Sequence, residues 1–106
     1  FKPYIRPNVI DIIQYIKNNN CDIKILSHNW SSIPIYHALN KIIDINDIIC
    51  NEINSDGSIT IKNVTSMDKL QHTLTLKNKY NKCMYVGDSW GDILSSFNCD
   101  YSVWMK

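Results

Sequence analysis

The fold is decided by the stretch Cys83-Met84-Tyr85-Val86-Gly87-Asp88-Ser89-Trp90-Gly91-Asp92. Its first four residues are a short apolar run, which is typical of a strand buried in a sheet. Gly87 and Asp88 end that strand, and three apolar residues then follow at helical spacing, Ile93, Leu94 and Phe97. A strand that turns into a helix is the repeating unit of α/β proteins.

Upstream of this stretch, the chain begins with a predicted helix and a predicted strand. Pro7 fits the first turn of the helix, where the missing N–H costs nothing. The apolar residues of the helix recur at helical spacing, Val9, Ile12, Ile13 and Ile16. Asn18-Asn19-Asn20 ends it, because Asn tolerates the left-handed conformation. Residues 23–26, Ile-Lys-Ile-Leu, then form a buried-strand candidate that ends at Ser27.

A second helix and a hairpin occupy the middle of the chain. Ser31 or Ser32 fits the N-cap of the helix, with Pro34 in its first turn. The apolar stripe predicted for this helix consists of Ile35, Tyr36, Leu39, Ile42 and Ile43. A short strand follows at residues 48–50. The sequence Asn54-Ser55-Asp56-Gly57 then predicts a hairpin turn between Ile53 and the run Ser58 to Ile61.

A third helix precedes the opening stretch, and a strand follows it. Ser66 fits the cap of that helix, which carries Leu70 and Leu74 four residues apart. The final strand begins at Tyr101 and runs to Trp104. This alternation predicts a doubly wound α/β fold, in which helices cover a parallel sheet.

The length and charge of the chain limit the classes of function that it could have. With 106 residues the chain is one domain at most, over residues 1–106, and its net charge is +1. The sequence has no cluster of basic residues of the kind that binds nucleic acid. No apolar run approaches the roughly 18 residues of a membrane span. No secretory signal pattern opens the chain. The four cysteines form no Cys-x-x-Cys pair. We therefore expect reduced thiols and a cytoplasmic location.

Polar residues that suit phosphate chemistry follow the predicted strands. Ser27 and Asp88 each follow a strand, and Lys69 lies in the first turn of the helix between them. Ligands bind at the carboxyl ends of such strands. A hydroxyl and a lysine suit a phosphate group, and a carboxylate suits Mg²⁺. Taken singly, Ser27 could be a helix cap, Lys69 a solvated lysine, and Asp88 a turn-capping residue.

These residues also carry a family resemblance. Ile25-Leu26-Ser27, Lys69 at the start of a helix, and the stretch from Tyr85 to Asp92 resemble motifs two, three and four of the haloacid dehalogenase superfamily. The resemblance spans nearly the whole chain, in the correct order. It implies a three-layer Rossmann-like core whose parallel sheet is incomplete, because the first strand is missing. No cap domain is visible.

Two further segments extend the resemblance. Tyr4-Ile5-Arg6-Pro7-Asn8-Val9 looks like the arginine-proline segment before motif two, and Cys50-Asn51-Glu52-Ile53 followed by Asp56-Gly57 is similar to the phosphoserine-phosphatase-like branch. Within that branch, residues 66–100 look like the phosphatase domain of plant thiamin monophosphate phosphatases and related fungal proteins.

The resemblance implies a Mg²⁺-dependent phosphatase of a small phosphorylated metabolite, acting through an aspartyl-phosphate. The implied residues are Ser27 and Lys69 for catalysis, Ser27, His28, Asn29 and Lys69 for substrate binding, and Asp88 and Asp92 for the metal. Asp92 could also act through water or by orienting Lys69. None of the three histidines has metal-ligand spacing, and Trp30 suits either a pocket wall or ordinary packing.

The family's nucleophile is absent from the chain. It belongs to an Asp-x-Asp signature at the end of the first strand, and no such signature precedes Ser27. We therefore expect this chain alone to be inactive, and its parent protein to be the enzyme. Without the central strand, residues 23–26 and 83–86 should either stand apart or pair directly, and the polypeptide should be marginal or molten.

Two other readings compete with the phosphatase. Gly87-Asp88-Ser89 resembles the nucleophile block of the GDS-type lipases, but no histidine follows Ser89 to activate it. That reading is discarded. A non-catalytic module that binds phosphate or a protein partner remains open.

Overall fold

The computed structural model describes residues 8–105 and divides into two compact units between Lys62 and Asn63. We call these unit 1 and unit 2. That both belong to one domain, as the sequence predicts, stays a prediction. Pro7 and the arginine-proline segment lie outside the described residues, apart from Asn8 and Val9. No helix within residues 8–105 is long and apolar enough to cross a membrane.

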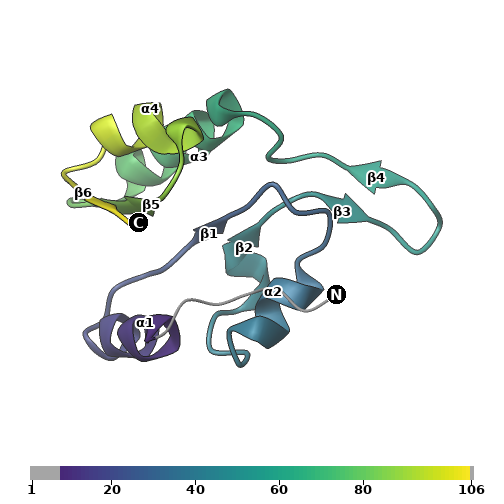
Figure 1. The fold of residues 1–106 in the computed structure, drawn as a ribbon, viewed down its shortest axis with the longest axis horizontal. Coiled ribbons are helices and arrows are strands. Elements are labelled where there is room, and N and C mark those ends of the chain that lie inside the picture. The colour runs from purple at the N-terminus through teal and green to yellow at the C-terminus, as the bar shows by residue number, and fades with distance from the viewer. Residues whose placement is uncertain (1–7, 106) are drawn as a thin grey trace. The chain divides into compact units, whose positions relative to one another are not determined.

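Unit 1 contains two helices, two strand pairs and one turn of 3-10 helix (Figure 1). In chain order these are α1 (Val9–Asn18), β1 (Ile25–Leu26), α2 (Ile33–Ala38), the 3-10 helix Ile45–Asp47, β2 (Ile48–Ile49), β3 (Glu52–Ile53) and β4 (Ile59–Thr60). Strands β1 and β2 pair in parallel, as predicted, and β3 and β4 pair antiparallel.

Helix α1 ends where the asparagines predict. Asn20 has the left-handed φ of 61°. Its N–H donates to the carbonyl of Lys17 at 3.0 Å, and the N–H of Cys21 donates to that of Ile16 at 3.4 Å. These two bonds form a Schellman motif, which satisfies carbonyls that the end of a helix leaves without partners.

Helix α2 is shorter than its apolar stripe predicts. It ends at Ala38, although the stripe continues to Ile43. Asn40 and Lys41 both have positive φ, and their N–H groups donate to His37 and Tyr36 in a second Schellman motif. The expectation of one helix through Ile43 is therefore wrong, because this turn takes the chain out of the helix first.

The apolar stripe is nevertheless buried, because the chain folds back after the turn. Leu39 and Ile43 are buried with Ile13 of α1 and Ile48 of β2. Cys50, which is 1% exposed, completes this core. Unit 1 is thus held together by apolar packing of its helices against the β1–β2 pair.

The β3–β4 hairpin forms at the predicted Asp-Gly turn. Gly57 has a φ of 88°, a conformation that residues with a Cβ seldom adopt. The N–H of Asn54 donates to the carbonyl of Ser58 at 2.8 Å and closes the turn. Asp56 accepts from the N–H of Ser58 at 2.9 Å. The turn prediction is confirmed.

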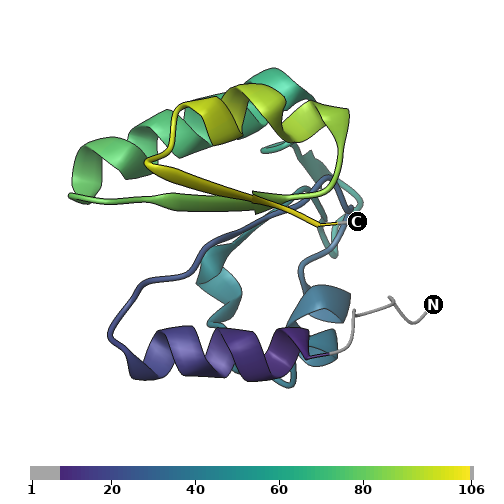
Figure 2. The same cartoon turned by 60° about the vertical axis from the view of Figure 1, so that its left-hand side comes forward.

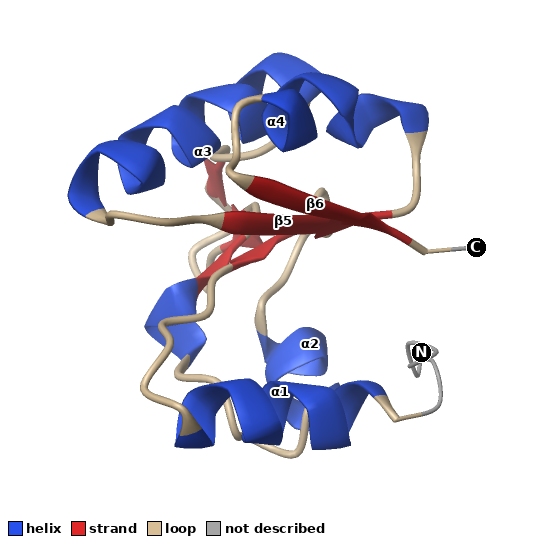
Figure 3. Ribbon diagram, turned by 90° about the vertical axis from the view of Figure 1, so that its left-hand side faces the viewer, coloured by secondary structure: helices blue, strands red, loops and turns tan. Residues whose placement is uncertain are grey.

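Unit 2 is a strand pair covered by helices on one face (Figure 2, Figure 3). In chain order its elements are α3 (Ser66–Lys79), β5 (Met84–Gly87), the 3-10 helix Trp90–Asp92, α4 (Ile93–Phe97) and β6 (Tyr101–Trp104). Strands β5 and β6 pair in parallel, with Met84 opposite Tyr101 and Val86 opposite Val103. The α/β class and the parallel pairing are confirmed.

The face of β5 and β6 away from the helices is exposed, which corrects the prediction that residues 83–86 form a buried strand. Met84 is 53% exposed and Val86 is 50% exposed. Their partners Tyr101 and Val103 are exposed as well. Strand propensity formed the pair, but burial depends on the layers around a strand, which its sequence does not specify.

The strands of residues 8–105 form three separate two-stranded sheets. Strand β1 pairs with β2, and β5 pairs with β6. The expected arrangement of residues 23–26 and residues 83–86 involves one segment of each unit, and it stays a prediction.

Candidate functional site

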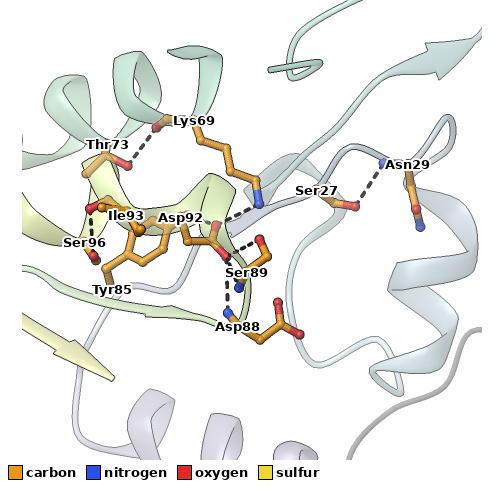
Figure 4. Close-up of polar contacts among 10 residues, drawn as sticks. All are labelled: Ser27, Asn29, Lys69, Thr73, Tyr85, Asp88, Ser89, Asp92, Ile93 and Ser96. Carbon is orange, nitrogen blue, oxygen red and sulfur yellow. Dashed lines mark hydrogen bonds and ion pairs between the residues drawn. The ribbon is translucent and has the colours of Figure 1, made fainter. Parts of the chain in front are cut away.

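Asp92 is the buried centre of a polar cluster in unit 2 (Figure 4). It is 3% exposed. Its Oδ1 accepts from Lys69 Nζ at 3.0 Å and from Tyr85 Oη at 2.6 Å. Its Oδ2 accepts from the N–H of Asp88 at 3.2 Å, and from the N–H and Oγ of Ser89 at 3.3 and 3.1 Å. Both carboxylate oxygens are therefore engaged by donors of the chain itself.

Gly87 makes room for this carboxylate. A Cβ at Gly87 would lie 2.7 Å from the Cβ, Cγ and Oδ2 of Asp92. Atoms of a side chain cannot approach so closely, so a residue with a Cβ at this position would have to displace Asp92. Gly91 has only ordinary contacts, with the nearest atom 3.7 Å from its Cβ position. The two glycines of the motif thus differ in their structural role.

Lys69 is positioned by the first turns of α3. The N-cap is Thr65, one residue earlier than the predicted Ser66. Its Oγ1 accepts from the N–H of Asp68 at 3.3 Å, and Asp68 Oδ2 accepts from the N–H of Thr65 at 3.0 Å. This capping box sets where the helix begins. Thr73, which is buried, donates to the carbonyl of Lys69 at 2.8 Å.

The electrostatics of the cluster favour charged Asp92. Burial by itself would raise the pKa of Asp92, but the hydrogen bonds from Tyr85 and Lys69 outweigh it and lower the pKa to about 2. Burial and the neighbouring Asp92 carboxylate raise the pKa of Tyr85. Asp92 is therefore an anion that holds Lys69 as its counterion, with side chains 5% and 14% exposed.

Asp88 differs from Asp92 in its surroundings. Asp88 is exposed and directly follows β5, and its backbone N–H donates to Asp92. Among residues 8–105 no group of three or more His, Cys, Asp and Glu side chains could hold a metal ion. Mg²⁺ commonly takes only one or two protein carboxylates, with water and phosphate oxygens completing its shell. Asp88 fits as one such ligand, whereas the saturated oxygens of Asp92 do not.

Ser27 follows β1 in unit 1. Its N–H donates to the carbonyl of Ile49 at 3.0 Å and extends the parallel ladder by one bond. Its Oγ accepts from the N–H of Asn29 at 3.1 Å (Figure 4). His28 and Asn29, the other predicted substrate-binding residues, are exposed, and so is Trp30.

The loop after Ser27 is held by Asn51, which is 1% exposed. The Nδ2 of Asn51 donates to the carbonyl of His28 at 3.2 Å, and its N–H donates to that of Asn29 at 3.0 Å. Its Oδ1 accepts from the N–H of Lys62 at 2.8 Å. Asn51 is thus a positioning residue for the predicted substrate loop.

Hydrogen bonds within unit 2 join Asp92 to Lys69 and Asp88, and within unit 1 Ser27 is hydrogen-bonded to Ile49 and Asn29. Sequence reasoning gave no role to Tyr85 and read Asn51 only as part of a resemblance. Side chains alternate along a strand, so Tyr85 lies on the same face as Gly87. This spacing could have indicated that Tyr85 contacts the residues that follow Gly87. Nothing in the local sequence indicates the contacts of Asn51.

Comparison with protein-family models found no match for this chain, and comparison with curated proteins found none either.

Proposed function

We propose that the chain is a partial haloacid-dehalogenase-like core, and that its parent protein is a Mg²⁺-dependent phosphatase of a small phosphorylated metabolite. The observation that supports this most is the partly buried Lys69–Asp92 ion pair at the carboxyl end of β5, beside the exposed Asp88. A cation fixed in this position suits the negative charge of a phosphoryl group.

The cluster would act by fixing the ammonium group of Lys69. An ammonium has three N–H donors, and its bond to Asp92 Oδ1 leaves capacity for phosphate oxygens. Because Asp92 is itself held by Tyr85 and Ser89, the position of Lys69 Nζ is set before a ligand arrives. Asp92 is therefore proposed to orient Lys69, and Asp88 to be the metal ligand.

A metal bound by Asp88 would supply charge neutralisation for the phosphate. Ser27 would donate its hydroxyl proton to a phosphate oxygen, with His28 and Asn29 in the same substrate-binding segment. The nucleophile has no counterpart in residues 1–106, because the sequence contains no Asp-x-Asp before Ser27. We therefore expect binding, but no turnover, from this chain alone.

The binding part is tested on the chain itself. Inorganic phosphate is titrated with and without Mg²⁺ while backbone amide resonances are recorded. We expect saturable shifts at Lys69, Asp88 and Ser89 that strengthen with Mg²⁺. Lys69→Ala should abolish them, whereas Lys79→Ala, at the far end of the same helix, should not. Equal shifts in both variants would overturn the assignment of Lys69.

The catalytic part is tested on the parent protein. Asp88→Asn should abolish phosphatase activity at limiting Mg²⁺, because a neutral amide replaces an anionic ligand. Lys69→Ala should lower kcat/KM more than Ser27→Ala, because charge-assisted hydrogen bonds are about twice as strong as neutral ones. Turnover of Asp88→Asn close to that of the wild type would contradict the metal assignment.

A non-catalytic module that binds phosphate or a partner is the second candidate. The absence of Asp-x-Asp from residues 1–106 favours it. The gene sequence immediately upstream of Phe1 discriminates between the two. An encoded strand that ends in Asp-x-Asp supports the enzyme, and an upstream sequence without one supports the binding module.

A further inference from the structure

Cys83 and Cys99 lie at the two ends of the segment that carries Asp88 and Asp92. The carbonyl of Cys83 accepts from the N–H groups of Asp100 and Tyr101 at 3.0 and 3.1 Å. Since Asp100 directly follows Cys99, the backbone dimensions place the Cα atoms of Cys83 and Cys99 within roughly 8 Å. Disulfides join Cα atoms about 4.4–6.8 Å apart, so only a small adjustment separates this pair from bonding distance.

The Cys83 side chain lies on the side of the strand that faces the helices. Side chains alternate along a strand, so Cys83 points to the same side of β5 as Tyr85, opposite to the exposed Met84. Tyr85 faces the helices, because its hydroxyl donates to Asp92 at the start of α4. The Cys99 thiol lies close enough to Cys83 to be influenced by it, and burial together with Cys83 raises the pKa of Cys99.

We propose that Cys83 and Cys99 form a reversible disulfide that closes the segment between them. Both thiols are free and partly buried in the structure. The oxidant is a small-molecule disulfide. A cysteine thiolate attacks it, releases one small thiol and becomes a mixed disulfide. The second cysteine then displaces the other small thiol, so that two protein thiols are oxidised and one small disulfide is reduced to two thiols.

Closure has a structural consequence for the polar cluster. The bond ties the start of β5 to the end of α4, and Asp88 and Asp92 lie in the loop between them. Cross-linking a loop of this length restricts the unfolded chain more than the folded one. Oxidation therefore stabilises unit 2. Burial raises the pKa of Cys99, so the reaction proceeds faster as the pH rises toward that pKa.

The experiment uses the 106-residue chain in glutathione buffers of graded redox ratio. After the remaining thiols are blocked with N-ethylmaleimide, peptides are mapped by mass spectrometry. We expect a Cys83–Cys99 disulfide, and an exposed Cys21 that carries only glutathione. The oxidised chain should melt roughly 10 °C higher than the reduced one.

Cys99→Ser is the matched variant. In this variant Cys83 should form only the mixed disulfide with glutathione. The melting temperature of the variant should no longer depend on the redox ratio. A wild-type chain in which both Cys83 and Cys99 carry glutathione, or in which Cys83 bonds to Cys21, would overturn the proposal.

Discussion

Unit 1 and unit 2 each pair two parallel strands and pack helices on them, but they bury different residues. All of the buried apolar residues of residues 8–105 belong to unit 1, namely Ile13, Leu39, Ile43, Ile48 and Cys50. The buried residues of unit 2 are all polar, namely Asn63, Thr73, Asp92, Ser95 and Ser96. The two units therefore have a similar local architecture but differ in the residues that they bury.

The difference predicts how each unit responds to change. Apolar burial is roughly proportional to area and does not depend on the charge state of any group. A buried polar network depends on every donor and acceptor being matched. We expect unit 1 to be sensitive to the loss of volume and unit 2 to be sensitive to the loss of charge.

The largest effect is expected for Asp92→Asn. It leaves the Lys69 ammonium, which is partly buried, without its carboxylate, and breaking such a pair costs about 4 kcal/mol. Amide hydrogen exchange would show lost protection across α3 and β5, with α1 unchanged. Asp11→Asn, on the exposed first turn of α1, is the control and should stay within about 0.5 kcal/mol. If the amides of unit 2 kept their full protection from exchange in Asp92→Asn, the expected difference between the two units would be contradicted.

The second effect is expected for Ile43→Ala in unit 1. Ile43 is 2% exposed, and truncation of a buried isoleucine costs about 3 kcal/mol through lost burial and a cavity. Hydrogen exchange should accelerate in α1 and β2. Phe97→Ala in unit 2 removes a larger side chain that is 77% exposed, and should change stability by less than about 0.5 kcal/mol. A larger loss from Phe97 than from Ile43 would reverse our assignment of the apolar core.

The third effect is a loss of stability in acid that is larger in unit 2, because Asp92 is buried there, whereas Asp56 of unit 1, whose pKa is lowered by hydrogen bonds from Ser58, is exposed. Burial would raise the pKa of Asp92, but the hydrogen bonds from Tyr85 and Lys69 outweigh it and lower the pKa to about 2, from its ordinary value of 3.8. A lowered pKa stabilises the fold above the unfolded value, and this contribution is lost as the pH falls from 3.8 through about 2. The contribution is roughly 2 kcal/mol.

Hydrogen exchange corrected for its intrinsic pH dependence measures this loss. Backbone hydrogen bonds also lower the pKa of Asp68 and of Asp100 in unit 2, so Asp92→Asn isolates the contribution of Asp92. The same acid dependence in wild type and Asp92→Asn would show that other carboxylates cause it.

The smallest effect separates the two glycines of the site. Gly87→Ala should cost about 1.5 kcal/mol, because its Cβ meets Asp92 at 2.7 Å and must displace it. Gly91→Ala adds a Cβ with a nearest contact of 3.7 Å and should be close to neutral. Thermal unfolding of the two variants measures the difference. Equal stability would mean that Asp92 can move without cost, and its orienting role for Lys69 would fail.

Much of the fold is predictable from short-range chemistry. The asparagines that end α1, the Asp-Gly turn of the hairpin and the order of helices and strands all depend on residues close together in sequence. The early end of α2 was missed, because a periodic apolar stripe does not distinguish a continuous helix from one that turns at Asn40. The cap of α3 was missed by one residue, since Thr65 and Ser66 both have a suitable hydroxyl.

The α/β class and the parallel orientation of neighbouring strands follow from the sequence alone. Tertiary structure decided how two similar aspartates differ. Asp92 is saturated because the fold brings Lys69, 23 residues away, and Tyr85 to its carboxylate, while Asp88 stays exposed. Local spacing places both aspartates after one strand, but the ion pair of Asp92 with Lys69 depends on a segment 23 residues away.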